Sequence, residues 1–113
     1  MNPEIKKQWV EALRSGEYKQ TQQKLRDDNG FCCLGVLCDL HAKAGLGHWD
    51  ENSWYYKCKD SEFMEAKNYL PNPVIQWAVV DSENPSINSA RLANLNDDHK
   101  SFAEIADLIE ANL

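Results

Sequence analysis

The sequence predicts a single α+β domain in which three to four helices pack on a small antiparallel sheet. Three observations support this fold class: amphipathic segments at both ends of the chain, an apolar central run from Phe31 to Ala44, and a turn signal just before that run. A chain of 113 residues can build one core and bury roughly two thirds of its unfolded surface. We therefore expect one domain over residues 1–113.

The first predicted element is a helix that begins after Asn2 and ends near Gly16. Asn2 can accept hydrogen bonds from the free amides of the first turn, and Pro3 suits the first helical position. Gly16 can adopt the left-handed conformation that ends a helix. At helical spacing, one face carries the apolar residues Ile5, Trp9, Ala12 and Leu13. We expect this face, and Trp9 in particular, to lie in the core.

Residues 17–26 are too polar for a core helix, and they lead into the turn signal Asp27-Asp28-Asn29-Gly30. Because an apolar run follows this turn, the order predicts a hairpin whose first strand is residues 17–26 and whose second strand begins at Phe31. Asn29 and Gly30 are residue types that tolerate a positive φ.

The central run is expected to continue from the second strand into a buried helix from Leu34 to Ala44. The stripe expected to face the core consists of Cys33, Leu37, Leu40, His41 and Ala44. Gly35 lowers helix propensity by about 1 kcal/mol relative to alanine. We therefore expect Gly35 to mark either the change from strand to helix or a close packing contact.

Residues 45–69 are the least regular part of the sequence and are rich in aromatic side chains. A second hairpin is expected there, between residues 48–50 and residues 54–59.

The remaining elements are predicted from caps and breakers. Asn72 is expected to cap a short helix from Pro73 to about Val80, and a polar loop broken by Pro85 should follow over residues 81–89. A capping box at Ser101 begins the last helix, whose apolar stripe continues to Leu113.

The net charge of −6 is unevenly distributed along the chain. Residues 1–26 carry six basic and three acidic residues, a local charge of +3, whereas residues 27–113 carry six basic and fifteen acidic residues, a local charge of −9. This balance argues against long duplex nucleic acid as a partner but permits a small anion near the N-terminal third. No apolar run approaches the roughly 18 residues of a membrane span, so we expect a cytoplasmic protein without a membrane partner.

A metal site has weak support. The candidate metal ligands are Cys32, Cys33, Cys38 and His41. A structural zinc site usually shows two short ligand pairs, and at most one is present here. We expect buried, reduced thiols and neither a metal nor another cofactor, although a metal on these four residues stays open.

Catalysis also lacks a signature. No nucleophile elbow, zinc-protease motif or phosphate-binding loop is present, and chance pairings of cysteine with histidine are not informative. We expect no catalytic residues, with a small hydrolase or nuclease as a remaining alternative.

A ligand-binding site has the most local support. The polar segment from Lys19 to Arg26 offers amides, a hydroxyl and cations, and the aromatic residues at positions 54–56 can stack on a base. The expected ligand-binding residues are Lys19, Gln20, Thr21, Gln23, Lys24, Arg26, Trp54 and Tyr56. Such a set suits a nucleotide-sized anion. In the alternative interpretation, the polar residues solvate an edge strand and the aromatic residues belong to the core.

Four motifs occur together over most of the chain: Trp9 to Tyr18, the run CCLGVLC from Cys32 to Cys38, Leu70-Pro71 before Trp77, and Leu95 to Ala106. In combination they resemble a family of small uncharacterised proteins encoded by tailed phages and prophages. Similar proteins tend to have glycine where this chain has His99, which affects only the shape of that turn.

The resemblance implies an accessory protein that counters antiviral defence in the cytoplasm of the host cell. The simplest mechanism is sequestration of a small nucleotide-like signal, and a homo-oligomer would deepen a small site. The alternative is an inhibitor that binds a host defence protein through an acidic surface near Asp97 and Asp98.

Overall fold

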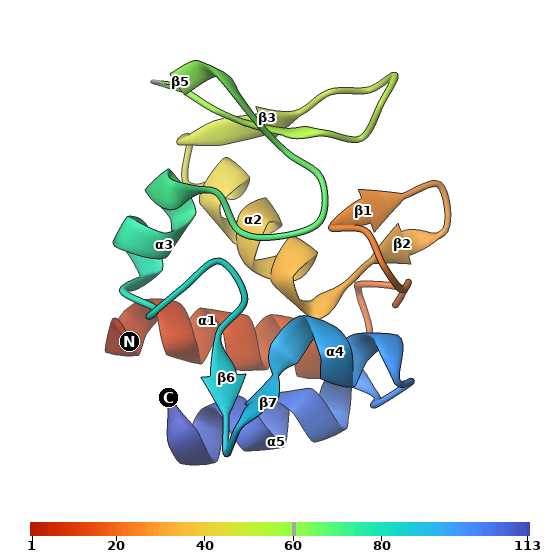
Figure 1. Cartoon of the computed structure of the whole chain (residues 1–113), viewed down its shortest axis with the longest axis vertical. Helices are drawn as coiled ribbons and strands as arrows, with labels where there is room; N and C mark the ends of the chain where they lie inside the picture. Colours follow the sequence, from red (N-terminus) through yellow and green to blue (C-terminus); the bar gives the residue numbers. More distant parts are fainter. Residues whose placement is uncertain (60) are drawn as a thin grey trace.

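The computed structural model describes residues 1–59 and 61–113, and for residues 61–64 it describes the backbone alone. In this part of the chain five helices and three small antiparallel sheets form one α+β domain, which confirms the predicted fold class (Figure 1). The helices are α1 (Pro3–Arg14), α2 (Cys33–Lys43), α3 (Asn72–Ala78), α4 (Leu92–Asp97) and α5 (Phe102–Asn112). The strands are β1 (Arg26–Asp27), β2 (Gly30–Phe31), β3 (Gly47–Trp49), β4 (Tyr56–Cys58), β5 (Ser61–Ala66), β6 (Ser86–Ile87) and β7 (Ala90–Arg91).

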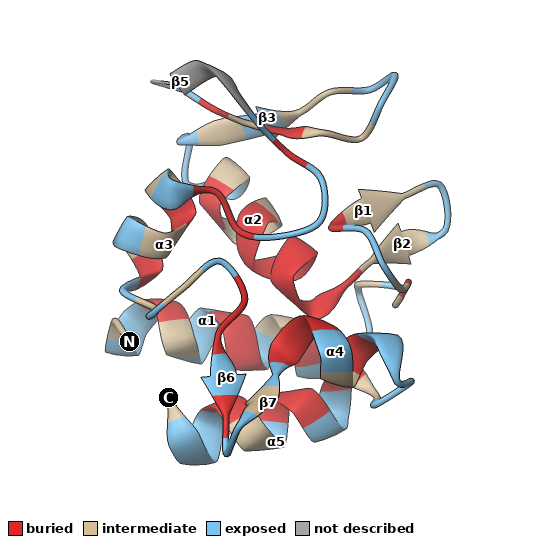
Figure 2. Cartoon of the chain, viewed as in Figure 1, coloured by how far each residue is buried: buried red, intermediate tan, exposed pale blue. Residues whose placement is uncertain are grey.

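The centre of the fold is α2. Every residue from Cys33 to Cys38 is buried, so the first half of this helix is covered on all sides (Figure 2). Such a helix needs neighbours all round, and α2 contacts α1, α3, α4 and β3. The prediction of a buried helix from Leu34 to Ala44 is confirmed to within one residue at each end.

The two terminal helices lie side by side beneath α2 (Figure 1). Asn2 caps α1 as predicted, accepting hydrogen bonds from the amides of Glu4 and Ile5. Trp9 is fully buried and donates from its indole N–H to the carbonyl oxygen of Cys33 at 2.9 Å. The predicted cap of α5 is also confirmed, because the Ser101 hydroxyl accepts from the amide of Glu104 at 3.1 Å.

The prediction of a strand over residues 17–26 is wrong. Only Arg26 and Asp27 pair with β2, and residues 17–25 form bends with a single isolated bridge from Gln20 to Phe31. The chain turns at Gln23, whose φ of 72° lies in the left-handed region. Around that bridge, the Thr21 amide donates to the carbonyl oxygen of Phe31 and the Phe31 amide donates to that of Lys19. The side chains of Gln20 and Thr21 bond to α4 and to the turn, respectively.

Gly35 makes the close contact that its sequence context predicts. A Cβ atom built on Gly35 would lie 1.7 Å from the carbonyl oxygen of Leu25. Leu25 is itself fully buried. The absence of a side chain at Gly35 therefore lets the segment that precedes Arg26 lie against α2.

The predicted hairpin around residues 48–50 and 54–59 is confirmed by the pairing of β3 with β4. This hairpin gains a third strand, β5, and β3 lies at the edge of the sheet. Asn72 lies inside α3 and gives it no side-chain cap, so that prediction is wrong. The polar loop expected over residues 81–89 instead enters a short hairpin of β6 and β7.

His99 adopts a φ of 67°, in the left-handed region where glycine has no steric penalty. This explains why glycine would suit the turn before α5. In the described residues, no helix is long and apolar enough to cross a membrane.

Candidate ligand-binding site

Two of the eight predicted site residues, Gln20 and Thr21, are used to hold the fold. Both bond to Asn96, which is fully buried. The Asn96 side-chain oxygen accepts from Nε2 of Gln20 at 2.9 Å and from the amide of Cys33 at 3.2 Å. Its Nδ2 donates to the carbonyl oxygen of Thr21 at 2.7 Å. Asn96 therefore joins the polar segment to α2 and α4.

Three further predicted residues, Lys19, Gln23 and Lys24, are exposed. The amide of Gln23 donates to Oδ1 of Asp97 at 2.7 Å, which directs this part of the segment toward α4. None of the three lines the pocket beside Arg26 described below.

Tyr56 is fully buried, with its hydroxyl 2.6 Å from Nδ1 of His41. Burial raises the pKa of Tyr56 and lowers the pKa of His41, so both rings are held neutral. Gly47 packs directly on the Tyr56 hydroxyl. The structure thus places Tyr56 in the core and offers no face of its ring to a ligand.

The last two predicted residues, Arg26 and Trp54, lie together. The guanidinium carbon of Arg26 is 4.2 Å from the ring centroid of Trp54, 4.8 Å from that of Phe31 and 5.5 Å from that of Trp49. Trp54 is fixed in turn by its indole N–H, which donates to Oδ1 of Asp28 at 2.7 Å. Three aromatic rings therefore hold one guanidinium group in place.

Arg26 forms no ion pair with any carboxylate of the described residues. The two nearest carboxylates in the sequence are already bonded. Asp27 accepts from the hydroxyl of Thr21 and from two backbone amides of the turn, and Asp28 accepts from Trp54. Neither aspartate forms a salt bridge with Arg26, although both carboxylates keep their negative charge while they accept hydrogen bonds from these neutral donors.

An open pocket of about 570 Å³ lies beside this arginine. We call it the arginine pocket, and its lining residues are Arg26, Ala42, Gly47, His48, Trp49, Glu51 and Trp54. Its wall includes the open edge of β3. The backbone of Leu46 and that of Asp50 bond toward the β4 side, so the alternation of an antiparallel ladder directs the amides of Gly47 and Trp49 away from β4.

Trp49, one wall of the arginine pocket, is held by Asp39. Oδ1 of Asp39 accepts from the Trp49 indole at 3.1 Å, and Oδ2 accepts from the Tyr18 hydroxyl at 2.5 Å. Lys43 lies 3.6 Å from the same carboxylate and donates to the Tyr18 hydroxyl at 2.9 Å. Burial and the neighbouring carboxylate raise the pKa of Tyr18, so its proton stays on the phenol.

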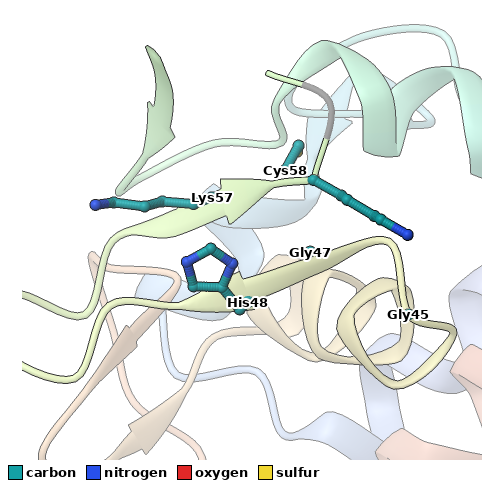
Figure 3. A pocket seen from close by; sticks show the side chains of 6 residues that line it. Gly45, Gly47, His48, Lys57 and Cys58 are labelled. Atoms are coloured by element: carbon teal, nitrogen blue, oxygen red, sulfur yellow. The ribbon is translucent and has the colours of Figure 1, made fainter. Parts of the chain in front are cut away.

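A second pocket, of about 550 Å³, lies against the β3–β4 hairpin (Figure 3). We call it the lysine pocket, and its lining residues are Gly45, Gly47, His48, Lys57, Cys58 and Lys59. Figure 3 shows His48 of β3 beside Lys57 of β4, with the Lys57 side chain directed away from Gly45. The two pockets share Gly47 and His48.

Among the described residues, no group of three or more His, Cys, Asp or Glu side chains is placed to hold a metal ion. The four cysteines are buried and unbridged, and burial raises the pKa of each thiol, that of Cys32 to about 11. Neutral buried thiols are poor nucleophiles and poor ligands.

Sequence reasoning did not include Trp49, His48 or Asp39 among the site residues. The signal that could have found Trp49 is the predicted hairpin itself, because it brings residues 48–50 opposite residues 54–59. Asp39 had no such signal, since its partner Tyr18 lies 21 residues away across an irregular segment.

Comparison with known proteins identifies one family. Residues 1–113 match the model described as "Domain of unknown function (DUF8296)". No curated protein and no solved structure matches the chain.

Proposed function

We propose that this chain, which belongs to the DUF8296 domain family, binds a small nucleotide-like anion in the arginine pocket and leaves it chemically unchanged. One observation carries the proposal. The guanidinium of Arg26 is packed by three aromatic rings, lacks a carboxylate partner among the described residues, and borders an open pocket.

The chemistry of the pocket suits a ligand with a flat ring and a negative charge. Arg26 presents a planar set of donors that matches phosphate oxygens, and aromatic packing fixes its orientation before a ligand arrives. The amides of Gly47 and Trp49 at the edge of β3 add backbone donors. Base–aromatic stacking contributes about 1–3 kcal/mol per base, and Trp54 offers a half-buried ring for it.

Among the described residues that line the arginine pocket, Glu51 is the acidic one. Its carboxylate repels a phosphoryl group but can accept a hydrogen bond from an exocyclic amino group of a base. We therefore expect the base toward Glu51 and the phosphoryl group toward Arg26.

We extend the proposal to biology through the phage and prophage resemblance of the sequence motifs. A protein that holds a nucleotide signal without changing it would lower the free concentration of that signal in the host cell. This role needs hydrogen-bond donors and aromatic rings but no catalytic group. The arginine pocket has such donors and rings.

The first experiment is a thermal-shift screen of the purified protein against cyclic mononucleotides, cyclic dinucleotides, ADP-ribose and the adenosine and guanosine phosphates. A ligand at 100 times its Kd stabilises the folded state by about 2.7 kcal/mol. We expect a clear rise in Tm with at least one compound, and recovery of that compound unchanged, by mass spectrometry, after denaturation.

Matched variants locate the site. Arg26→Gln should abolish the shift, whereas Lys24→Gln removes an exposed charge nearby that does not line the pocket and should keep it. Circular dichroism checks that both variants are folded. No shift with any compound, or an equal loss in both variants, would overturn the proposal.

A further inference from the structure

The two pockets meet at β3. Gly47 and His48 line both of them. The lining of the arginine pocket also includes Arg26, Trp49 and Trp54, and that of the lysine pocket includes Lys57 and Lys59. The shared residues make the two pockets neighbours, so one ligand long enough to pass His48 can contact both.

The charges of the lysine pocket are not equivalent. Lys57 is engaged in two ion pairs, at 3.2 Å to Asp50 and 3.3 Å to Glu65, so its charge is compensated. Lys59 is exposed and forms no ion pair with the carboxylates of the described residues. His48, also exposed, stands on the face of the hairpin next to Lys57 (Figure 3).

We propose that His48 and Lys59 form a second anion subsite, so that the ligand of this protein carries more than one phosphoryl group and extends around β3 from the arginine pocket into the lysine pocket. This inference rests on the proposed function, because it takes the arginine pocket as the place of the base. It specifies the ligand class as nucleoside polyphosphates or dinucleotides, as opposed to nucleosides and monophosphates.

The backbone of the lysine pocket favours such a ligand. Gly45 lines it without a side chain, and a Cβ atom there would meet no atom within 4 Å, so a phosphoryl group can approach the main chain at Gly45. At Gly47 the place of a side chain is already taken, because a Cβ would lie 2.2 Å from the Tyr56 hydroxyl.

The test is a titration series by calorimetry at constant ionic strength. The probes are adenosine, AMP and ATP, and the same three compounds with guanine. We expect ATP, or GTP, to bind about tenfold more tightly than the monophosphate, as expected for hydrogen bonds to a charged group. Lys59→Gln should remove most of that gain and leave the monophosphate affinity unchanged.

Control variants separate the two pockets. Lys67→Gln removes another exposed lysine near the sheet that lines neither pocket, and it should change neither affinity. Trp54→Ala should weaken the nucleoside, the monophosphate and the triphosphate by the same factor. His48→Gln should weaken the triphosphate more than the nucleoside.

The outcomes distinguish the two proposals. If the monophosphate and triphosphate bind equally, or if Lys59→Gln and Lys67→Gln act alike, the second subsite is refuted while nucleotide binding in the arginine pocket stands. If Arg26→Gln and Trp54→Ala leave every affinity unchanged, the arginine pocket is not the site and both proposals fail.

Discussion

Replacing Gly35 with alanine should destabilise this protein, against the usual preference of helices. At an open helical position the change would stabilise by about 1 kcal/mol, because alanine is the better helix former. At Gly35 the added Cβ would lie 1.7 Å from the carbonyl oxygen of Leu25 and 2.6 Å from its carbonyl carbon. Both are backbone atoms, so the clash cannot be relieved by rotating a side chain.

The segment at Leu25 is held from two sides. Its amide donates to the carbonyl oxygen of Lys67 at 2.7 Å, and its carbonyl oxygen accepts from the amide of Cys32 at 3.1 Å. Overpacking a core costs about 1–3 kcal/mol, and losing one of these hydrogen bonds costs about 1 kcal/mol more. After the gain in helix propensity, the free energy of unfolding should fall by about 1–3 kcal/mol.

Urea and thermal unfolding measure this change, and at about 4 °C per kcal/mol the Tm should fall by several degrees. Because Leu25 precedes Arg26, Gly35→Ala should also weaken ligand binding. Gly16→Ala serves for comparison. Its Cβ meets no atom within 4 Å, so any loss of stability in that variant comes from the φ of +77° alone and not from a clash. An unchanged or higher Tm for Gly35→Ala would refute the reasoning.

Three further predictions concern the surroundings of the site. Asp39→Ala leaves the Trp49 indole without its acceptor and should lower the free energy of unfolding, measured in urea, by about 1–3 kcal/mol. Tryptophan fluorescence should change as well. Asp39→Asn keeps one acceptor oxygen and should lower the free energy of unfolding by less. Burial lowers the pKa of His41, so the unfolded chain binds this proton more tightly, and stability should fall as the pH drops through the unfolded value of 6.5. Melting curves from pH 8 to pH 5 test this, and a His41→Gln variant with an equally steep profile would argue against it. The four buried thiols should react slowly with a thiol reagent at pH 8 in the native protein and rapidly after denaturation; rapid labelling of the native protein would contradict their burial.

The elements that could be predicted correctly from the sequence are those whose capping residues and apolar stripes lie close together in the chain. The caps at Asn2 and Ser101 and the apolar stripes behind them depend on residues within a few positions of one another. The polar segment of residues 17–25 was different, because its conformation is set by partners far away in the chain, chiefly Asn96. Nothing in the alternation of its own residues indicates those partners.

The binding site shows the same division. Arg26 and Trp54 could be chosen from residue type, but their contact depends on the turn of one hairpin meeting the loop of another. Tyr56 illustrates the effect of register: in β4 its ring faces inward opposite Trp49, while Lys57 faces outward. A shift of one residue would reverse these faces, and the sequence alone does not fix the register there.

The pairing of α1 with α5 has a consequence for the order of folding. Arg14 bonds to Asp107 and Glu110, across 93 and 96 residues of chain. A contact of that separation carries a loop-closure cost that local contacts avoid, and such topologies fold more slowly. On the ribosome, the first helix of this protein is made long before its neighbour, so the face it shares with α5 stays exposed to water and to chaperones until α5 has been synthesised.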